Sequence, residues 1–145
     1  MSTHRLEDEL AIRNILGAMA QLADSESDLQ QYRKLFAENG SWTLLAAAGA
    51  ADQDALTYVG RTQIVDGALS RRKSGGQGPG SNVMHDVSTT VVDFDDDDTA
   101  RVTSYFKLFG DTHQNPRVLG MGRYFDTFIR TGTGWELSER IVAPA

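Results

Sequence analysis

The sequence has no cysteine, and only 3 of its 145 residues are proline. Without cysteine the chain has no disulfide, no thiolate metal site, no iron–sulfur cluster and no cysteine nucleophile, and it fits a reducing compartment. No segment approaches the roughly 18 consecutive apolar residues of a membrane-spanning helix. The first residues are acidic and lack the apolar stretch of a signal peptide. We therefore expect a soluble, cytoplasmic protein with no membrane partner.

Basic residues are the minority among the charged side chains. Lys and Arg number 14 against 20 Asp and Glu, which gives a formal net charge of −6. A nucleic-acid-binding protein needs a basic face that displaces counterions from the phosphates. The charge balance therefore argues against a nucleic-acid partner.

Nucleotide and metal motifs are missing as well. The glycine-rich segment 74–80 lacks the G-x-G-x-x-G spacing and the lysine of a phosphate loop, so we expect a flexible connection or a cover over a cavity. The acidic segment 93–98 lacks the Gly and Glu of a calcium loop and is interpreted as a solvated hairpin turn. His4 and His113 have no neighbour at a ligand spacing. The sequence predicts neither a metal site nor a cofactor.

The apolar pattern predicts helices first and long strands afterwards. Residues 4–24 carry a stripe of helical period, and a capping-box pattern at Ser27 starts a second helix that ends at Asn39-Gly40. Further on, we expect a short strand at 41–45, a loop at 46–56, a helix at 62–73 and strands at 82–93, 99–109, 118–130 and 135–143. Separate helical and strand regions indicate a single α+β domain over residues 1–145, with helices on one face of an antiparallel sheet.

His85 lies inside one of the predicted strands. With a period of two it shares a face with Val83, Val87, Thr89 and Val91, and this otherwise apolar face should point inward. An inward histidine is either a hydrogen-bonded core residue or, if a cavity is present, a proton carrier, because imidazole titrates near neutral pH.

Asp24 continues the buried stripe of the first predicted helix, four residues after Ala20 and eight after Leu16. It also lies at the carboxyl end of that helix, where the dipole disfavours a carboxylate. Asp24 either begins the turn or points inward, and an inward carboxylate needs a partner. His85 would provide one.

Three further residues have side chains suited to a site. Arg140 is placed on the face of Ser138 and Val142, opposite Leu137, so it is either exposed to solvent or functional. Trp42 and Tyr58 combine an aromatic ring with a polar group and suit either a core or a cavity wall.

The order of these segments resembles a known family. The matching segments are Leu22-Ala-Asp24, Tyr32 to Trp42, Tyr58-Val-Gly60, Met84-His-Asp-Val87, Gly122 to Asp126 and Gly134 to Arg140. Together they are similar to the SnoaL-like branch of the nuclear transport factor 2-like superfamily. The resemblance implies a cone-shaped α+β barrel, in which three N-terminal helices pack on a strongly curved antiparallel sheet and enclose a pocket.

The resemblance also implies a function. Scytalone dehydratase, hexachlorocyclohexane dehydrochlorinase and bile-acid 7α-dehydratase use an Asp–His pair, and Asp24 and His85 fall at the matching places. Arg140 and Tyr58 would act on the leaving group or oxyanion, and Trp42, Met19, Tyr105 and Tyr124 would bind the substrate. We expect a cofactor-independent lyase or isomerase for a hydrophobic cyclic molecule, assembled as a homo-oligomer, either a dimer or a trimer. The alternatives are a small-molecule-binding module without catalysis, a polyketide cyclase or ketosteroid-isomerase-like enzyme, and a structural β-subunit of a larger oxygenase, for which the chain is short.

Overall fold

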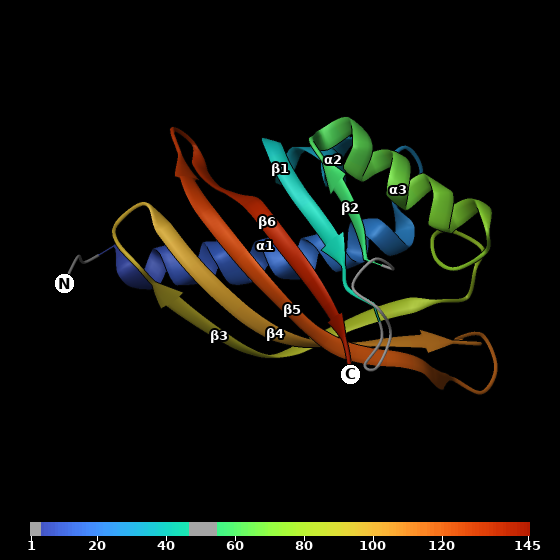
Figure 1. Ribbon diagram of the computed structural model, residues 1–145. Helices are drawn as coiled ribbons and strands as arrows, with labels where there is room; N and C mark the ends of the chain where they lie inside the picture. The colour runs from blue at the N-terminus through green and yellow to red at the C-terminus, as the bar shows by residue number, and fades with distance from the viewer. Residues whose placement is uncertain (1–3, 47–54) are drawn as a thin grey trace.

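The computed structural model describes residues 4–46 and 55–145, so most of the expected loop at 46–56 lies outside the described residues. Within this part of the chain, three helices and six strands follow one another (Figure 1). The helices are α1 (Arg5–Ser25), α2 (Gln30–Lys34) and α3 (Arg61–Lys73), and the strands are β1 (Phe36–Leu44), β2 (Leu56–Val59), β3 (Met84–Phe94), β4 (Thr99–Gly110), β5 (Arg117–Thr131) and β6 (Gly134–Pro144). None of these helices combines the length and the apolar character needed to cross a membrane.

The strands form one mixed sheet in the order β2-β1-β6-β5-β4-β3. Strands β3 to β6 are an antiparallel meander, as the sequence predicts. In contrast, β1 runs parallel to β6, so the prediction of a wholly antiparallel sheet is wrong at this pairing. This contact joins strands far apart in the chain, and no local pattern specifies its direction. β2 and β3 remain the edges, so the sheet does not close into a barrel.

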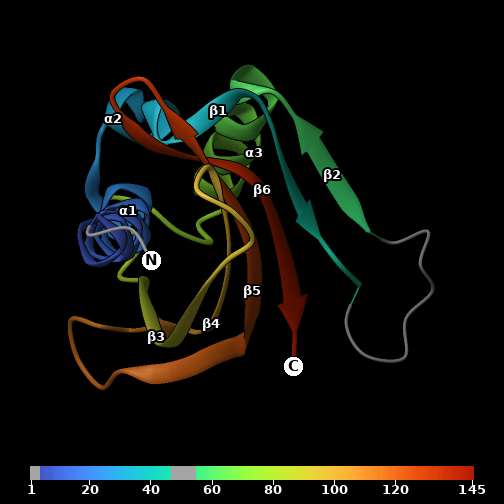
Figure 2. The same ribbon diagram turned by 90° about the vertical axis from the view of Figure 1, so that its left-hand side faces the viewer.

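Helix α1 lies on the concave side of the sheet (Figure 2) and packs against β3. Its inward stripe is apolar, and Ile12, Leu16 and Met19 are at most 4% exposed. These side chains join the fully buried Phe128 and Leu137 of the sheet in the core. Burial of each large apolar side chain contributes about 1.5–3 kcal/mol. The core therefore fixes α1, and with it the position of Asp24 in its last turn.

The segment after α1 differs from the prediction. Helix α2 has only 5 residues, and Leu29, which precedes it, has a left-handed backbone with φ 57°. The carboxylate of Glu26 accepts the N–H groups of Gln31 and Tyr32 at 2.8 and 2.9 Å, so the expected capping box at Ser27 is wrong. Asn39-Gly40 does not end a helix but lies inside β1, where a side chain at Gly40 would lie 3.0 Å from the carbonyl oxygen of Ala37 in the same strand and 3.2 Å from that of Leu137 in β6.

Two irregularities in the sheet change which side chains face inward. Between Ser88 and Val91 the register of β3 against β4 shifts, and Val91 is exposed rather than inward as predicted. A second shift leaves Ser138 of β6 without an opposite residue on β5. As a result, Leu137 and Arg140 are both buried and share the inner face, whereas strict alternation had placed them on opposite faces.

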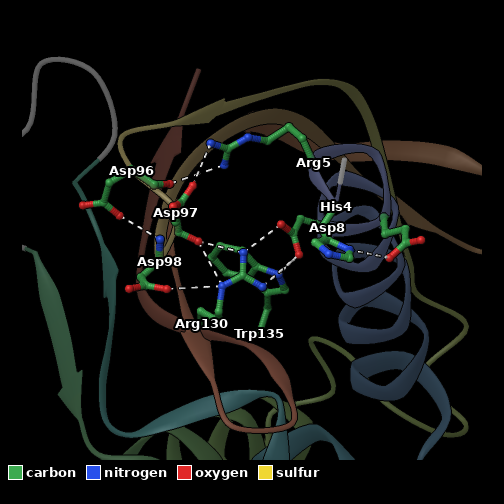
Figure 3. A network of polar contacts seen from close by, with 9 residues as sticks. His4, Arg5, Asp8, Asp96, Asp97, Asp98, Arg130 and Trp135 are labelled. Carbon is green, nitrogen blue, oxygen red and sulfur yellow. Dashed lines mark hydrogen bonds and ion pairs between the residues drawn. The ribbon is translucent and has the colours of Figure 1, made fainter. Parts of the chain in front are cut away.

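A polar network holds the first turn of α1 against β5, β6 and the β3–β4 turn (Figure 3). The carboxylate of Asp8 accepts hydrogen bonds from Arg130 at 3.0 and 2.7 Å and from the indole N–H of Trp135 at 3.0 Å. Arg130 also donates to the backbone carbonyl of Asp97 in the β3–β4 turn. The hydrogen bonds from Arg130 hold the pKa of Asp8 below its usual value. The acidic segment 93–98 thus does form a hairpin turn, and arginines attach this turn to the helix.

Candidate functional site

Asp24 and His85 lie in direct contact. Oδ1 of Asp24 is 2.7 Å from Nδ1 of His85, and Oδ2 accepts the backbone N–H of His85 at 3.0 Å. This N–H is available because β3 is an edge strand and has a ladder partner on one side only. The two side chains are 11% and 16% exposed, so the pair is largely removed from solvent. One carboxylate therefore fixes both the backbone and the ring of His85.

The contact also determines the tautomer of the imidazole. An ionised carboxylate only accepts hydrogen bonds, so Nδ1 of His85 must carry the proton. In the neutral ring Nε2 then has a free lone pair. Because His85 lines a cavity and Asp24, which is not among the lining residues, contacts Nδ1, we infer that Nε2 is the nitrogen presented to a bound molecule.

The end of helix α1 is stabilised from outside the helix. No basic residue lies in its last turn, where the helix dipole opposes the charge of Asp24. Arg72 of α3 supplies the cation and donates to the carbonyl oxygens of Leu22, Ala23 and Ser27 at 3.3, 3.0 and 3.3 Å. The charge of Arg72 thus offsets the cost of a carboxylate at this helix end.

The cavity has a volume of about 280 Å³ and lies between α1, α3 and the inner face of the sheet. Most of its wall is apolar, which suits a hydrophobic small molecule. The polar or titratable lining residues are Tyr32, Arg71, Gln77, His85, Tyr124 and Arg140. Trp42 and Met19, both expected to bind substrate, also line it.

Arg140 forms a buried ion pair beneath the cavity wall. Its Nε and Nη2 donate to the two oxygens of Asp126 at 2.8 and 2.9 Å, and its guanidinium lies 3.8 Å from the ring centre of Tyr124. Although burial acts to lower it, the pKa of Arg140 is raised by Asp126, so this side chain stays charged. Burial raises the pKa of Tyr124 to about 12, so the phenol is neutral at pH 7. Both groups can donate hydrogen bonds, but Arg140 does not release a proton.

The structure does not bring Tyr58 or Tyr105 to the cavity. The ring of Tyr58 packs beside Trp42, with centroids 5.7 Å apart, and occupies the space that a side chain at Gly67 would need. Tyr105 is 41% exposed on the outer face of β4, where Arg123 stacks on it. Neither belongs to the cavity lining, and the alternation along β4 places Phe106 there instead of Tyr105.

Sequence reasoning missed Arg71 and Gln77. Nε of Arg71 donates to Oε1 of Gln77 at 3.3 Å, and its guanidinium lies 4.4 Å from the ring centre of Trp42. Gln77 belongs to the glycine-rich segment that was expected to be a flexible connection or a cavity cover. The only sequence signal was a single amide among glycines. Within the described part of the chain, no three His, Asp or Glu side chains gather where they could hold a metal ion.

The family model described as the SnoaL-like domain matches residues 4–141. The chain belongs to the SnoaL-like domain family. The match covers most of the chain of this SnoaL-like protein. None of the curated proteins is similar enough to count as a match.

Solved structures support the same fold. An NTF2-like protein with a cystatin-like fold from Novosphingobium aromaticivorans is 24% identical, with a TM-score of 0.75 over 96% of this chain and 82% of that one. Rv3472 from Mycobacterium tuberculosis, a protein of unknown function, is 17% identical, with a TM-score of 0.79 over 98% and 74% of the two chains. A candidate scytalone dehydratase from N. aromaticivorans is 17% identical, with a TM-score of 0.70 over 100% and 89%. At these identities the likeness concerns the fold alone.

Proposed function

We propose that the protein is a lyase or isomerase that removes a proton from a carbon atom of a hydrophobic cyclic small molecule, with His85 as the base. One observation carries the proposal: the carboxylate of Asp24 binds both Nδ1 and the backbone N–H of His85. This arrangement leaves Nε2 as the proton acceptor at the wall of an apolar cavity. A general base must hold this protonation state and this orientation before the substrate arrives.

In the proposed reaction, Nε2 takes the proton and the C–H electron pair forms a new double bond. In a lyase, the leaving group departs with the electrons of its own bond and can take the proton back from the imidazolium. Asp24 stabilises the imidazolium while it exists, as carboxylates do behind histidine bases. Arg140 stabilises negative charge on the departing or enolate oxygen through Nη1, the nitrogen that does not contact Asp126. The reaction needs no cofactor.

The proposal can be tested without the natural substrate. The bicyclic probe 5-nitrobenzisoxazole opens when one base removes the single C–H proton of its isoxazole ring, which breaks the N–O bond and releases a coloured phenolate. We expect the protein to accelerate this opening, and we expect His85→Ala to lower the rate by a factor of about 10²–10⁴. His113→Ala is the matched control, because His113 is exposed in the β4–β5 turn. It should leave the rate unchanged.

Two results would contradict the proposal. One is a rate for the unmodified protein that does not exceed that of His85→Ala. The other is equal loss in His85→Ala and His113→Ala, which would show that surface imidazoles cause the reaction. Either result, combined with retained binding of apolar molecules, would favour a binding protein without catalysis.

A further inference from the structure

The charges on the cavity wall are unequal. Two guanidinium groups, Arg71 and Arg140, line the cavity, and no carboxylate is among its described lining residues. This is the opposite of the whole chain, which has a formal net charge of −6. A mostly apolar cavity with cationic side chains and no lining anion favours a ligand that carries negative charge.

The two arginines are not equivalent. Asp126 occupies two donors of Arg140 and balances its positive charge with a carboxylate, although the guanidinium stays protonated. Within residues 4–46 and 55–145, no carboxylate lies within 4.0 Å of the guanidinium of Arg71. Other arginines of this part of the chain, such as Arg61, Arg130 and Arg140, do form ion pairs. Its charge acts on the phenols of both Tyr32 and Tyr124 inside the cavity. Arg71 is therefore the cation whose charge is left for a ligand.

Arg71 is also held in a fixed orientation. Its guanidinium stacks on Trp42, and its Nε is occupied by Oε1 of Gln77. The two terminal nitrogens remain as a planar pair of donors, which suits the two oxygens of a carboxylate. Gln77 is only 6% exposed, and because its oxygen accepts from Arg71, its amide nitrogen is a further donor.

The glycine-rich segment is built to place Gln77 there. The N–H of Gly76 donates to the carbonyl of Arg71 at 2.9 Å, so the chain folds back directly after α3. Gly78 has φ +92°, and a side chain at this position would lie 2.7 Å from the stem of Arg72. The glycines thus give a tight turn that keeps an amide buried at the cavity wall.

We propose that Arg71 and Gln77 bind the carboxylate of an apolar substrate, next to Trp42. This inference deepens the proposed function by naming the substrate class, a hydrophobic ring compound that carries a carboxylate. The anionic group lies at the α3 side of the cavity, and the ring extends over the apolar wall toward His85. The pairing orients the substrate and supplies the counter-charge that Arg71 lacks.

Calorimetric titration with 2-naphthoate and with 2-naphthamide tests this inference, because the two probes share a ring and differ in charge. We expect the protein to bind the acid at least about tenfold more tightly than the amide. Arg71→Met should remove most of this difference and leave the amide affinity nearly unchanged. Gln77→Glu is a second variant of nearly the same shape, and its own carboxylate should pair with Arg71 and abolish the preference.

Arg123→Met is the matched control. Arg123 also lies over an aromatic ring, that of Tyr105, but on the outer face of the sheet, and its removal should not alter the preference. Equal affinity for both probes, no binding of either, or equal weakening of both by Arg71→Met would overturn the inference. Because binding is measured without turnover, a protein that prefers the acid but does not open 5-nitrobenzisoxazole would refute the proposed base and leave this site intact.

Discussion

Replacement of Asp24 by Asn should switch the tautomer of His85 without creating a cavity at the site. Asp24 accepts two hydrogen bonds, one from Nδ1 and one from the backbone N–H of His85. Asparagine has one oxygen and one NH₂ group in the same shape. The backbone N–H can only donate, so the amide oxygen must face it and the NH₂ group must face Nδ1. Nδ1 then becomes an acceptor, the proton moves to Nε2, and the base loses its lone pair toward the cavity.

The expected magnitudes for activity and stability differ. Loss of the correct tautomer should cost about 10²–10⁴-fold in kcat/KM, since the whole general-base contribution is lost. The free energy of unfolding should fall by only about 1–3 kcal/mol, because two charge-assisted hydrogen bonds become neutral ones. No cavity is created, so the fold is retained.

Initial rates with 5-nitrobenzisoxazole and urea unfolding of the same samples measure both quantities. Asp66→Asn is a suitable control, because Asp66 is exposed on α3. Full activity of Asp24→Asn would refute the role of Asp24. A large loss of stability with proportional loss of activity would also refute it, since it would show that the substitution acts by unfolding the protein.

Two further predictions concern stability. Hydrogen bonds from Arg130 lower the pKa of Asp8 from 3.8, so between the two pKa values the native state binds fewer protons than the unfolded state. The resulting stabilisation is present above pH 3.8 and is lost as the pH falls through the lowered pKa. The urea midpoint should therefore fall less steeply from pH 6 to pH 2 in Asp8→Asn than in the unmodified protein. A slope equal to that of the unmodified protein would contradict this. Asp126→Asn leaves the charge of Arg140 buried and poorly paired, so we expect a loss of about 3–5 kcal/mol in urea unfolding, and Asp126→Leu combined with Arg140→Met should recover much of it. If the single variant is as stable as the parent, the pair does not have the role assigned here.

Regular periodicity allowed much of the fold to be predicted. The spacing of apolar residues in α1 and the alternation in β3 to β6 gave elements that agree with the structure to within a few residues. The same two periods pointed Asp24 and His85 inward from different elements, and the structure places them in contact. Their catalytic role remains a proposal.

The errors arise where local pattern and tertiary structure differ. The short α2 and the early start of β1 depend on the carboxylate of Glu26 and on pairing with β6, which are not visible in the local sequence. The unopposed Ser138 changes the side on which Arg140 lies, and a period of two cannot reveal such a shift.

The missed part of the site lies in a loop. Gln77 reaches the cavity because glycines at positive φ turn the chain back onto α3. Composition alone indicates only that such a segment is a turn or a loop. Arg71 was overlooked for a related reason, because its environment is made by Trp42 of β1 and by this turn.

The most direct test of the account is the position of the proton on His85. Long-range proton–nitrogen correlation spectra of the ¹⁵N-labelled protein distinguish a protonated ring nitrogen from a bare one, and His85→Ala assigns the signals. In neutral His85 we expect the proton on Nδ1, where Asp24 accepts it at 2.7 Å, and a bare Nε2 whose signal shifts when 2-naphthoate binds. A neutral ring with its proton on Nε2 would contradict the account, because the nitrogen that faces the cavity could then not act as a base.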